Sequence, residues 1–376
     1  MGVLELTRAL IERPSVTPDD AGCQQLIADQ LRPFGFEAEW FQFGEVSNLL
    51  LTRGEGKPSL WFLGHTDVVP PGPETAWHTP PFAAVERDGL LYGRGAADMK
   101  GAVAAMVNAL QRVSEENSPE KGQLGLLLTS DEEGIAVDGI AQVAALIQQR
   151  GSVPDHCLVG EPSSAERLGD TVRIGRRGSI HATLKLQGVQ GHTAYPQTLK
   201  NPVHELAPFL DALVSAHWDE GNELFPPTHC QVSNLQAGSG AENVTPGTLL
   251  IKFNFRNSPA SPEQDLYQRV QQMLRRCGLA DAELDWRVSA VPFQSPAGVL
   301  REAVVHSISE VLEETPELNT GGGTSDGRFI APLGCEVIEL GLLNHSIHQA
   351  NEHVAVEDLS RLAETYRSIA NHLLSS

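Results

Sequence analysis

The stretch Ser59-Leu-Trp-Phe-Leu-Gly-His-Thr-Asp-Val-Val-Pro70 decides how the rest of this chain is interpreted. It opens with an apolar run typical of a buried strand and leads into a turn rich in Pro and Gly. Residues two apart in a strand point to the same side, so His65 and Asp67 should project together from the strand's carboxyl end. Ligands bind at that end of the strands in α/β sheets. The pair predicts either the beginning of a metal site, in which Asp67 orients the His65 ring, or a polar strand end without a function.

Length, charge and cysteine content narrow the class of protein. A chain of 376 residues with 41% hydrophobic side chains is long enough for about two domains with substantial cores. The net charge of -21 argues against nucleic acid and anionic membranes as partners, since both bind basic faces. The five cysteines form no Cys-x-x-Cys pair, as is typical of a reducing compartment. The sequence lacks a signal-peptide pattern and any apolar run of membrane-spanning length, so we expect a cytoplasmic protein.

Up to about residue 163, apolar strand-like runs alternate with polar turns and helix-like segments. Besides the opening run, 123–129 and 155–159 have the continuous hydrophobicity of buried parallel strands, and helices are expected at 102–113 and 140–149. This order predicts an α/β fold with a mixed, mostly parallel sheet and flanking helices. The polar turns carry His65 and Asp67, Asp98, Glu132 and Glu133, and Glu161.

The pattern changes near Gly175, where apolar and polar residues begin to alternate as they do in half-solvated antiparallel strands. The order strand, helix, strand, strand, helix, strand is typical of a two-layer ferredoxin-like α+β unit. These elements are expected at 176–186, 202–215, 231–235, 248–257, 262–277 and 284–291. From about residue 296 helix and strand alternate again, ending in a helix over 356–374. We therefore predict a larger domain from residues 1–177 and 292–376, with 178–291 inserted as a second domain.

Six side chains of metal-ligand type fall in these turns and in a polar loop at 343–352. They are His65, Asp98, Glu132, Glu133, Glu161 and His348. A His and carboxylate set without Cys suits Zn²⁺, Co²⁺ or Mn²⁺ in a catalytic site, and two such ions can activate a shared water. Of the adjacent Glu132 and Glu133, one could bind metal while the other serves as a general base. Taken singly, each carboxylate is better interpreted as part of a solvated turn or a helix cap. Taken together, their spacing alone leaves both interpretations open.

Motifs along essentially the whole chain resemble those of the di-zinc amidohydrolases and peptidases of the aminoacylase and carboxypeptidase type. The first four are Gly64-His-Thr-Asp-Val-Val-Pro70, Gly93-Arg-Gly-Ala-Ala-Asp-Met-Lys-Gly101, Thr129-Ser-Asp-Glu-Glu-Gly134 and Gly160-Glu-Pro-Ser163. The others are Gly175-Arg-Arg-Gly-Ser179, Gly191-His-Thr-Ala-Tyr-Pro196, Asn243-Val-Thr-Pro246 and Gly322-Gly-Thr-Ser-Asp-Gly-Arg-Phe329.

The resemblance implies a role for each candidate ligand. Two Zn²⁺ ions, for which Co²⁺ can substitute, would be bridged by Asp98. His65 and Glu161 would complete one site, and Glu133 and His348 the other. Glu132 would be the general base that activates the bridging water. Asp67 would be the partner of His65, and a cis peptide is expected between Asp98 and Met99.

The resemblance also implies a homodimer, formed through the inserted domain. His192 would reach into the active site of the partner subunit and stabilise the oxyanion. The expected substrate-binding residues are Arg176, Ser179, Tyr195, Asn243, Arg256, Gly323, Thr324 and Asn344. Arginine suits this role because its planar guanidinium binds both oxygens of a carboxylate. An acidic chain that binds an anionic substrate needs such local positive charge.

Within the family, the Arg176-Arg-Gly-Ser179 motif and the glycine-rich motif at 322–329 indicate the branch that acts on a small-molecule N-succinylated diamino dicarboxylate. That branch removes succinate in diaminopimelate and lysine biosynthesis. Three alternatives stay open from the sequence: an acetylornithine deacetylase, a metal carboxypeptidase, or a binding protein that keeps the fold without activity. A substrate panel and the bound metal content discriminate between them.

Overall fold

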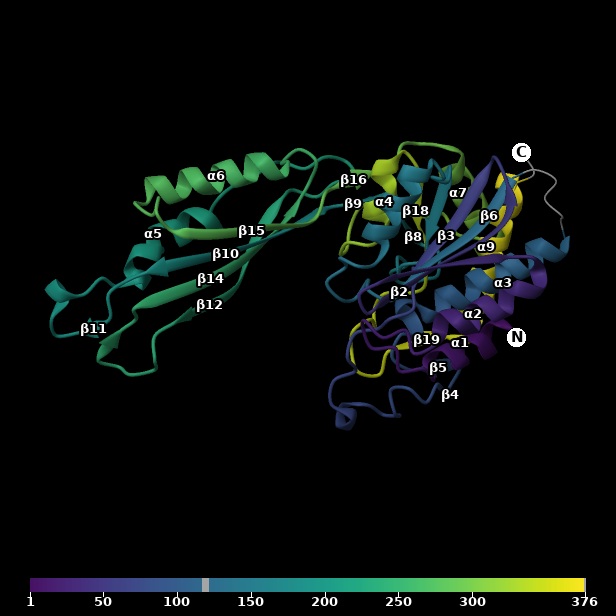
Figure 1. Ribbon diagram of the computed structural model, residues 1–376, viewed down its shortest axis with the longest axis horizontal. Coiled ribbons are helices and arrows are strands. Elements are labelled where there is room, and N and C mark those ends of the chain that lie inside the picture. The colour runs from purple at the N-terminus through teal and green to yellow at the C-terminus, as the bar shows by residue number, and fades with distance from the viewer. Residues whose placement is uncertain (117–121, 375–376) are drawn as a thin grey trace. The chain divides into compact units, whose positions relative to one another are not determined.

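The computed structural model describes residues 1–116 and 122–374, and the chain divides into two compact units (Figure 1). The first unit comprises Met1–Gly175, Gln294–Asn319 and Ser325–Ser376. The second comprises Arg176–Phe293 and the short segment Thr320–Thr324. That segment groups with the second unit because its Gly321 carbonyl accepts a hydrogen bond from Arg176 at 3.0 Å, and Thr320 donates to the Leu224 carbonyl at 2.5 Å. The domain borders expected from the sequence, 177/178 and 291/292, place this segment in the larger domain instead.

An eight-stranded mixed sheet forms the centre of the first unit. In spatial order its strands are β1 (Glu37–Phe43), β2 (Val46–Glu55), β6 (Gly122–Thr129), β3 (Ser59–His65), β7 (His156–Val159), β18 (Glu336–Glu339), β8 (Thr171–Arg173) and β17 (Glu317–Asn319). The central strand β3 runs parallel to both neighbours, with Leu63 opposite Leu127 of β6 and Val159 of β7. Strands β1, β2 and β6 pair antiparallel. The expected mixed, mostly parallel sheet is therefore confirmed.

Helices flank this sheet and bury its apolar strands. They are α1 (Val3–Ile11), α2 (Cys23–Leu31), α3 (Gly101–Glu116), α4 (Ile140–Arg150), α7 (Val299–Leu312), α8 (Gly327–Ile330) and α9 (Val356–Leu374). Helix α3 packs against α1 and α9, and the Phe62 ring of β3 lies 5.4 Å from the Tyr366 ring of α9. In the described part of the chain, none of the helices is both long and apolar enough to cross a bilayer.

A glycine in β3 allows helix α3 to approach the end of that strand closely. A Cβ at Gly64 would lie 2.7 Å from Cε of Met99 and 3.1 Å from Cγ2 of Val103. Both distances are shorter than ordinary carbon contacts. The absence of a side chain at Gly64 thus brings the Asp98–Met99 turn, which contains the expected cis peptide, next to His65.

A second, three-stranded sheet in the first unit was not anticipated. It consists of β19 (His353–Ala355), β5 (Leu90–Tyr92) and β4 (Val85–Arg87), with His353 opposite Tyr92. Strands this short carry too few residues to show a hydrophobic period. The sheet joins the loop after β18 to the segment just before Asp98.

The second unit contains a four-stranded antiparallel sheet and two long helices. Its elements are β10 (Gly178–Gln187), α5 (Pro202–Val214), β12 (His229–Ala237), β14 (Thr248–Asn257), α6 (Glu263–Arg276) and β15 (Glu283–Ala290), with spatial strand order β12-β14-β10-β15. Leu206 and Phe209 of α5 and Val270 of α6 share one apolar core with Phe253 and Phe255 of β14. This arrangement is the expected ferredoxin-like unit. A short ribbon, β11 (Gly191–His192) with β13 (Val244–Thr245), extends from it.

Candidate metal centre

His65 stands at the carboxyl end of β3, where the sequence places it. Its Nδ1 lies 2.9 Å from the Asp67 backbone carbonyl, and its Nε2 lies 3.1 Å from Oδ1 of Asp98 and 3.6 Å from Oε1 of Glu161. A ring that donates its Nδ1–H to a carbonyl presents the lone pair of Nε2 for coordination. His65 is thus oriented with Nε2 toward two carboxylates.

His348 lies on the opposite side of Asp98. Its Nε2 is 2.9 Å from Oε1 of Glu133 and 3.3 Å from Oδ2 of Asp98. The two oxygens of Asp98 therefore face different imidazoles, Oδ1 toward His65 and Oδ2 toward His348. This is the arrangement required of a carboxylate that bridges two cations.

The donor set fits the metal that the resemblance implies. The possible ligand atoms of His65, Glu132 and Glu161 all lie within 4.8 Å of one another, and so do those of His65, Asp98 and Glu133. Imidazole with carboxylate and no thiolate suits Zn²⁺ or Co²⁺ in a catalytic site. The structure thus brings together the five candidate ligands and Glu132, the general-base candidate, within the first unit.

The electrostatics of the cluster favour a bound cation. Burial raises the pKa of Glu161 well above its usual value, and the charges of Asp98 and Glu132 raise it further. Hydrogen bonds to Asp98 and Glu133 raise the pKa of His348 to about 10. Several buried carboxylates repel one another unless positive charge is placed among them. The concentration of negative charge thus accounts for the pKa shift at His348 and adds to the effect of burial at Glu161.

Asp67 was expected to be the partner that orients the His65 ring, and the structure divides this work between its backbone and its side chain. Its backbone carbonyl makes the direct hydrogen bond to His65, whereas its carboxylate oxygen is 3.7 Å from Nδ1. The carboxylate instead accepts hydrogen bonds from the backbone N–H groups of Glu133 at 3.1 Å and Glu132 at 3.4 Å. Asp67 thus fixes the turn that presents the two glutamates.

Glu352 is a residue whose role the sequence did not reveal. Its buried carboxylate accepts hydrogen bonds from the Arg94 guanidinium at 2.6 Å and from the backbone N–H groups of Gly95, Ala97 and Asp98 at 3.0, 2.9 and 3.1 Å. These contacts fix the backbone that carries the bridging candidate. A single Glu in a polar loop has no regular spacing to other residues in the sequence. Nothing in the sequence therefore distinguishes a buried structural Glu from a solvent-exposed one.

The expected substrate-binding residues lie in different units. Arg176, Ser179, Tyr195, Asn243, Arg256, Gly323 and Thr324 belong to the second unit, and Asn344 belongs to the first. Within the second unit, Ser179 of β10 lies opposite Arg256 of β14.

His192 and Tyr195 form a separate exposed group at β11. Their rings are 5.7 Å apart, and Nδ1 of His192 accepts a hydrogen bond from the backbone N–H of Ala194 at 3.0 Å. The metal cluster is therefore assembled by the first unit, whereas His192 belongs to the second.

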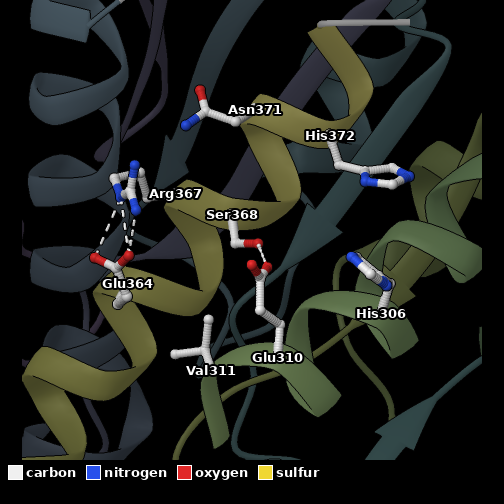
Figure 2. Close-up of a pocket in the computed structure, with 8 residues that line it drawn as sticks. All are labelled: His306, Glu310, Val311, Glu364, Arg367, Ser368, Asn371 and His372. Atoms are coloured by element: carbon white, nitrogen blue, oxygen red, sulfur yellow. Dashed lines mark hydrogen bonds and ion pairs between the residues drawn. The ribbon is translucent and has the colours of Figure 1, made fainter.

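A hollow of about 560 Å³ between α7 and α9 is not part of this site (Figure 2). His306 and Glu310 from α7 face Ser368 and His372 from α9, and Glu310 accepts a hydrogen bond from Ser368 at 3.0 Å. None of the residues lining the hollow belongs to the His and carboxylate cluster.

The fold and the cluster together define a metallohydrolase. The chain belongs to peptidase family M20/M25/M40, which it matches over residues 61–372, so the resemblance seen in the motifs is confirmed. It is 54% identical over 371 residues to the succinyl-diaminopimelate desuccinylase of Alkalilimnicola ehrlichii, covering 99% of each chain. It is also 54% identical over 372 residues to the enzyme of the same name from Methylococcus capsulatus, covering 99% of this chain and 98% of that one.

Solved structures with the same fold are more distant in sequence. The metallo-carboxypeptidase Sso-CP2 of Sulfolobus solfataricus superposes with a TM-score of 0.84 at 17% identity, covering 99% of each chain. The aminopeptidase PepT of Bacillus cereus gives a TM-score of 0.80 at 19% identity, covering 100% of this chain and 98% of that one. At these identities the likeness concerns the fold alone.

Proposed function

We propose that this chain hydrolyses N-succinyl-LL-2,6-diaminopimelate to succinate and LL-2,6-diaminopimelate in the cytoplasm, as a step of diaminopimelate and lysine biosynthesis. The observation that carries this proposal is the 54% identity, over almost the whole of both chains, to enzymes named for that reaction. The buried His and carboxylate cluster supplies the chemistry that such an amide hydrolysis requires.

We assign two Zn²⁺ ions to the cluster, with Co²⁺ as a possible substitute. His65, Glu161 and Asp98 would hold one ion, and Asp98, Glu133 and His348 the other; the contacts of the two Asp98 oxygens support this division. When bound, the ions would polarise the scissile carbonyl and lower the pKa of a water molecule.

Glu132 would accept the proton of the attacking water and deliver it to the leaving amine. Burial raises the pKa of its carboxyl group well above the usual value, and the charge of Asp326 raises it further. A carboxylate with a raised pKa is a better proton acceptor near neutral pH than an ordinary one. The Asp67 carboxylate supports this role by fixing the backbone of Glu132 and Glu133.

Arginines of the second unit would bind the carboxylates of the substrate. Partial burial lowers the pKa of Arg256, and the charge of the neighbouring Arg177 lowers it further. An anion bound between like charges of this kind relieves their repulsion. This local positive charge supports Arg176 and Arg256 as substrate-binding residues in an otherwise acidic protein, with Ser179, Tyr195, Asn243, Gly323, Thr324 and Asn344 as further contacts.

We further propose that the active form is a homodimer assembled through the second unit, with His192 stabilising the oxyanion in the partner's site. The exposure of His192 at β11 supports an intersubunit role. Sedimentation analysis combined with His192→Asn kinetics tests this part: a dimer with a strongly reduced kcat is expected.

The substrate assignment is tested by steady-state hydrolysis of N-succinyl-LL-2,6-diaminopimelate by the zinc-loaded protein, in parallel with N-acetylornithine and a C-terminally free dipeptide. A kcat/KM for the succinylated substrate at least a hundred times that for the other two is expected. Faster turnover of either alternative would assign the chain to a deacetylase or a peptidase instead.

A further inference from the structure

Two histidines outside the metal cluster point their ring nitrogens at each other. Nε2 of His345, in the loop before β19, lies 3.3 Å from Nε2 of His353, the first residue of β19. Their ring centroids are 5.2 Å apart and their planes meet at 63°. Neither residue belongs to the groups that form the candidate metal centre.

The other nitrogen of His353 has a defined partner. Nδ1 of His353 lies 2.8 Å from the backbone carbonyl of Asn351, to which it can only donate. The Nδ1–H tautomer leaves a lone pair on Nε2, the atom that faces His345. Donation of the second ring N–H to a backbone carbonyl is the usual arrangement of a metal-ligating histidine.

The separation of the two Nε2 atoms suits a shared ion. Two nitrogens bound tetrahedrally to Zn²⁺ at about 2.0–2.1 Å lie roughly 3.3 Å apart. The observed distance is 3.3 Å. No movement of either ring nitrogen away from its present position is required to reach that separation.

The surroundings leave room for further ligands. A hollow of about 200 Å³ is lined by both histidines, by Asp358 near the start of α9 and by apolar residues of β5 and of the loop that follows β18. His345 is exposed, so an ion can reach the pair from solvent. Water molecules can complete a four-coordinate site.

We infer that His345 and His353 form an additional binding site for a divalent transition-metal ion. The ion would connect the loop that carries His348 to β19, next to an existing contact: the Ser346 hydroxyl donates to the His353 carbonyl at 3.0 Å and accepts from its N–H at 3.2 Å. The site would therefore stiffen the loop that presents one ligand of the metal centre.

Metal stoichiometry tests the inference. Metal-free protein is dialysed to equilibrium against excess Zn²⁺, and bound zinc per chain is measured for wild type, His345→Asn, His353→Asn and the control His204→Asn, which removes an exposed histidine of α5. Each of the first two variants should bind one equivalent less than wild type, and His204→Asn should bind the same amount. Equal zinc content in wild type and His345→Asn would overturn the site.

A second measurement separates loss of the site from loss of folding. Exposed His345 is modified with diethyl pyrocarbonate and followed by peptide mass spectrometry. Zn²⁺ should slow its modification at least tenfold in wild type and leave the rate unchanged in His353→Asn, whereas Mg²⁺, which prefers oxygen ligands, should have no effect in either. Two outcomes would overturn the site: equal protection of His345 from modification by Zn²⁺ in His353→Asn, or no protection in wild type. Either would mean that the two rings share only a hydrogen bond.

Discussion

The carboxylate of Glu352 accepts a hydrogen bond from the backbone N–H of Asp98 at 3.1 Å, across 254 residues of sequence. The same carboxylate pairs with Arg94 and with two further N–H groups of the turn. Asp98 is the residue whose two oxygens face His65 and His348. The geometry of the candidate metal centre therefore depends on a buried carboxylate that binds the backbone of Asp98 rather than the side chain of a candidate ligand.

Replacement of Glu352 by Gln should weaken metal binding. The variant leaves the buried Arg94 charge without its counterion, which costs roughly 3–5 kcal/mol of unfolding free energy. Loss of a positioning contact of this kind typically reduces metal affinity or activity by roughly 10–100-fold. Competition with a chromophoric chelator measures the affinity, and urea denaturation measures the stability.

The exposed Glu357 in α9 supplies the matched control for that measurement, since Glu357→Gln removes one negative charge from the same region. The control should retain wild-type zinc affinity. If Glu352→Gln lost stability but bound zinc with unchanged affinity, Glu352 would be a purely structural residue.

Glu132→Gln should abolish proton transfer while leaving metal binding intact. General-base catalysis contributes about 10²–10⁴-fold to a rate, so kcat should fall by at least that order with little change in KM. Glu133→Gln is the comparison, because Glu133 contacts His348 at 2.9 Å and should instead lower the bound metal content. Near-normal turnover of Glu132→Gln would assign the proton transfer to another group.

Removal of metal should inactivate the protein reversibly. Activity should disappear after dialysis against a strong chelator and return on addition of Zn²⁺ or Co²⁺, but not of Mg²⁺, because imidazole ligands favour the first two ions. His65→Ala should not be restored by either ion at the concentrations that restore wild type. Restoration of His65→Ala at wild-type concentrations would exclude His65 as a ligand.

Asp219 should make a pH-dependent contribution to the free energy of unfolding of the second unit. Its carboxylate accepts hydrogen bonds from the N–H groups of Gly221 and Thr228 at 2.9 and 3.0 Å and from the Ser261 hydroxyl at 2.5 Å. Although burial acts in the opposite direction, the hydrogen bonds, that from Ser261 foremost, lower the pKa of Asp219 well below its usual range.

A lowered folded-state pKa means that the ionised carboxylate stabilises the fold above the unfolded-state pKa of about 3.9. The stabilisation by the Asp219 carboxylate decreases as the pH falls from this unfolded-state pKa toward the lower folded-state pKa. The free energy of unfolding of Asp219→Asn should therefore be lower than that of wild type at pH 7, and the difference should shrink toward pH 3. Glu220→Gln, an exposed neighbour, should show no such convergence. A difference independent of pH would mean that shape rather than charge matters at position 219.

Much of the architecture could be predicted because strands, turns and helices leave local patterns. The continuous apolar runs of β3, β6 and β7 and the polar turn after each one indicate which side chains lie at the carboxyl edge of the sheet. The element order of the second unit likewise follows from its alternating strands. By contrast, β19 and the grouping of Thr320–Thr324 with the second unit depend on contacts that leave no period in the sequence.

The amino-acid sequence by itself determined the fold class through local hydrophobic periods, and its motifs indicated the family. The candidate metal ligands followed from that family resemblance. Only the tertiary structure decided how the ligands are oriented. It showed that the backbone carbonyl of Asp67 contacts His65, whereas the carboxylate of Asp67 holds the turn that carries Glu132 and Glu133. It also brought Glu352 to Asp98 and His353 to His345. Hydrogen bonds between side chains and distant backbone groups have no sequence signature, since a buried polar atom is satisfied by whichever partner the folded chain brings within reach.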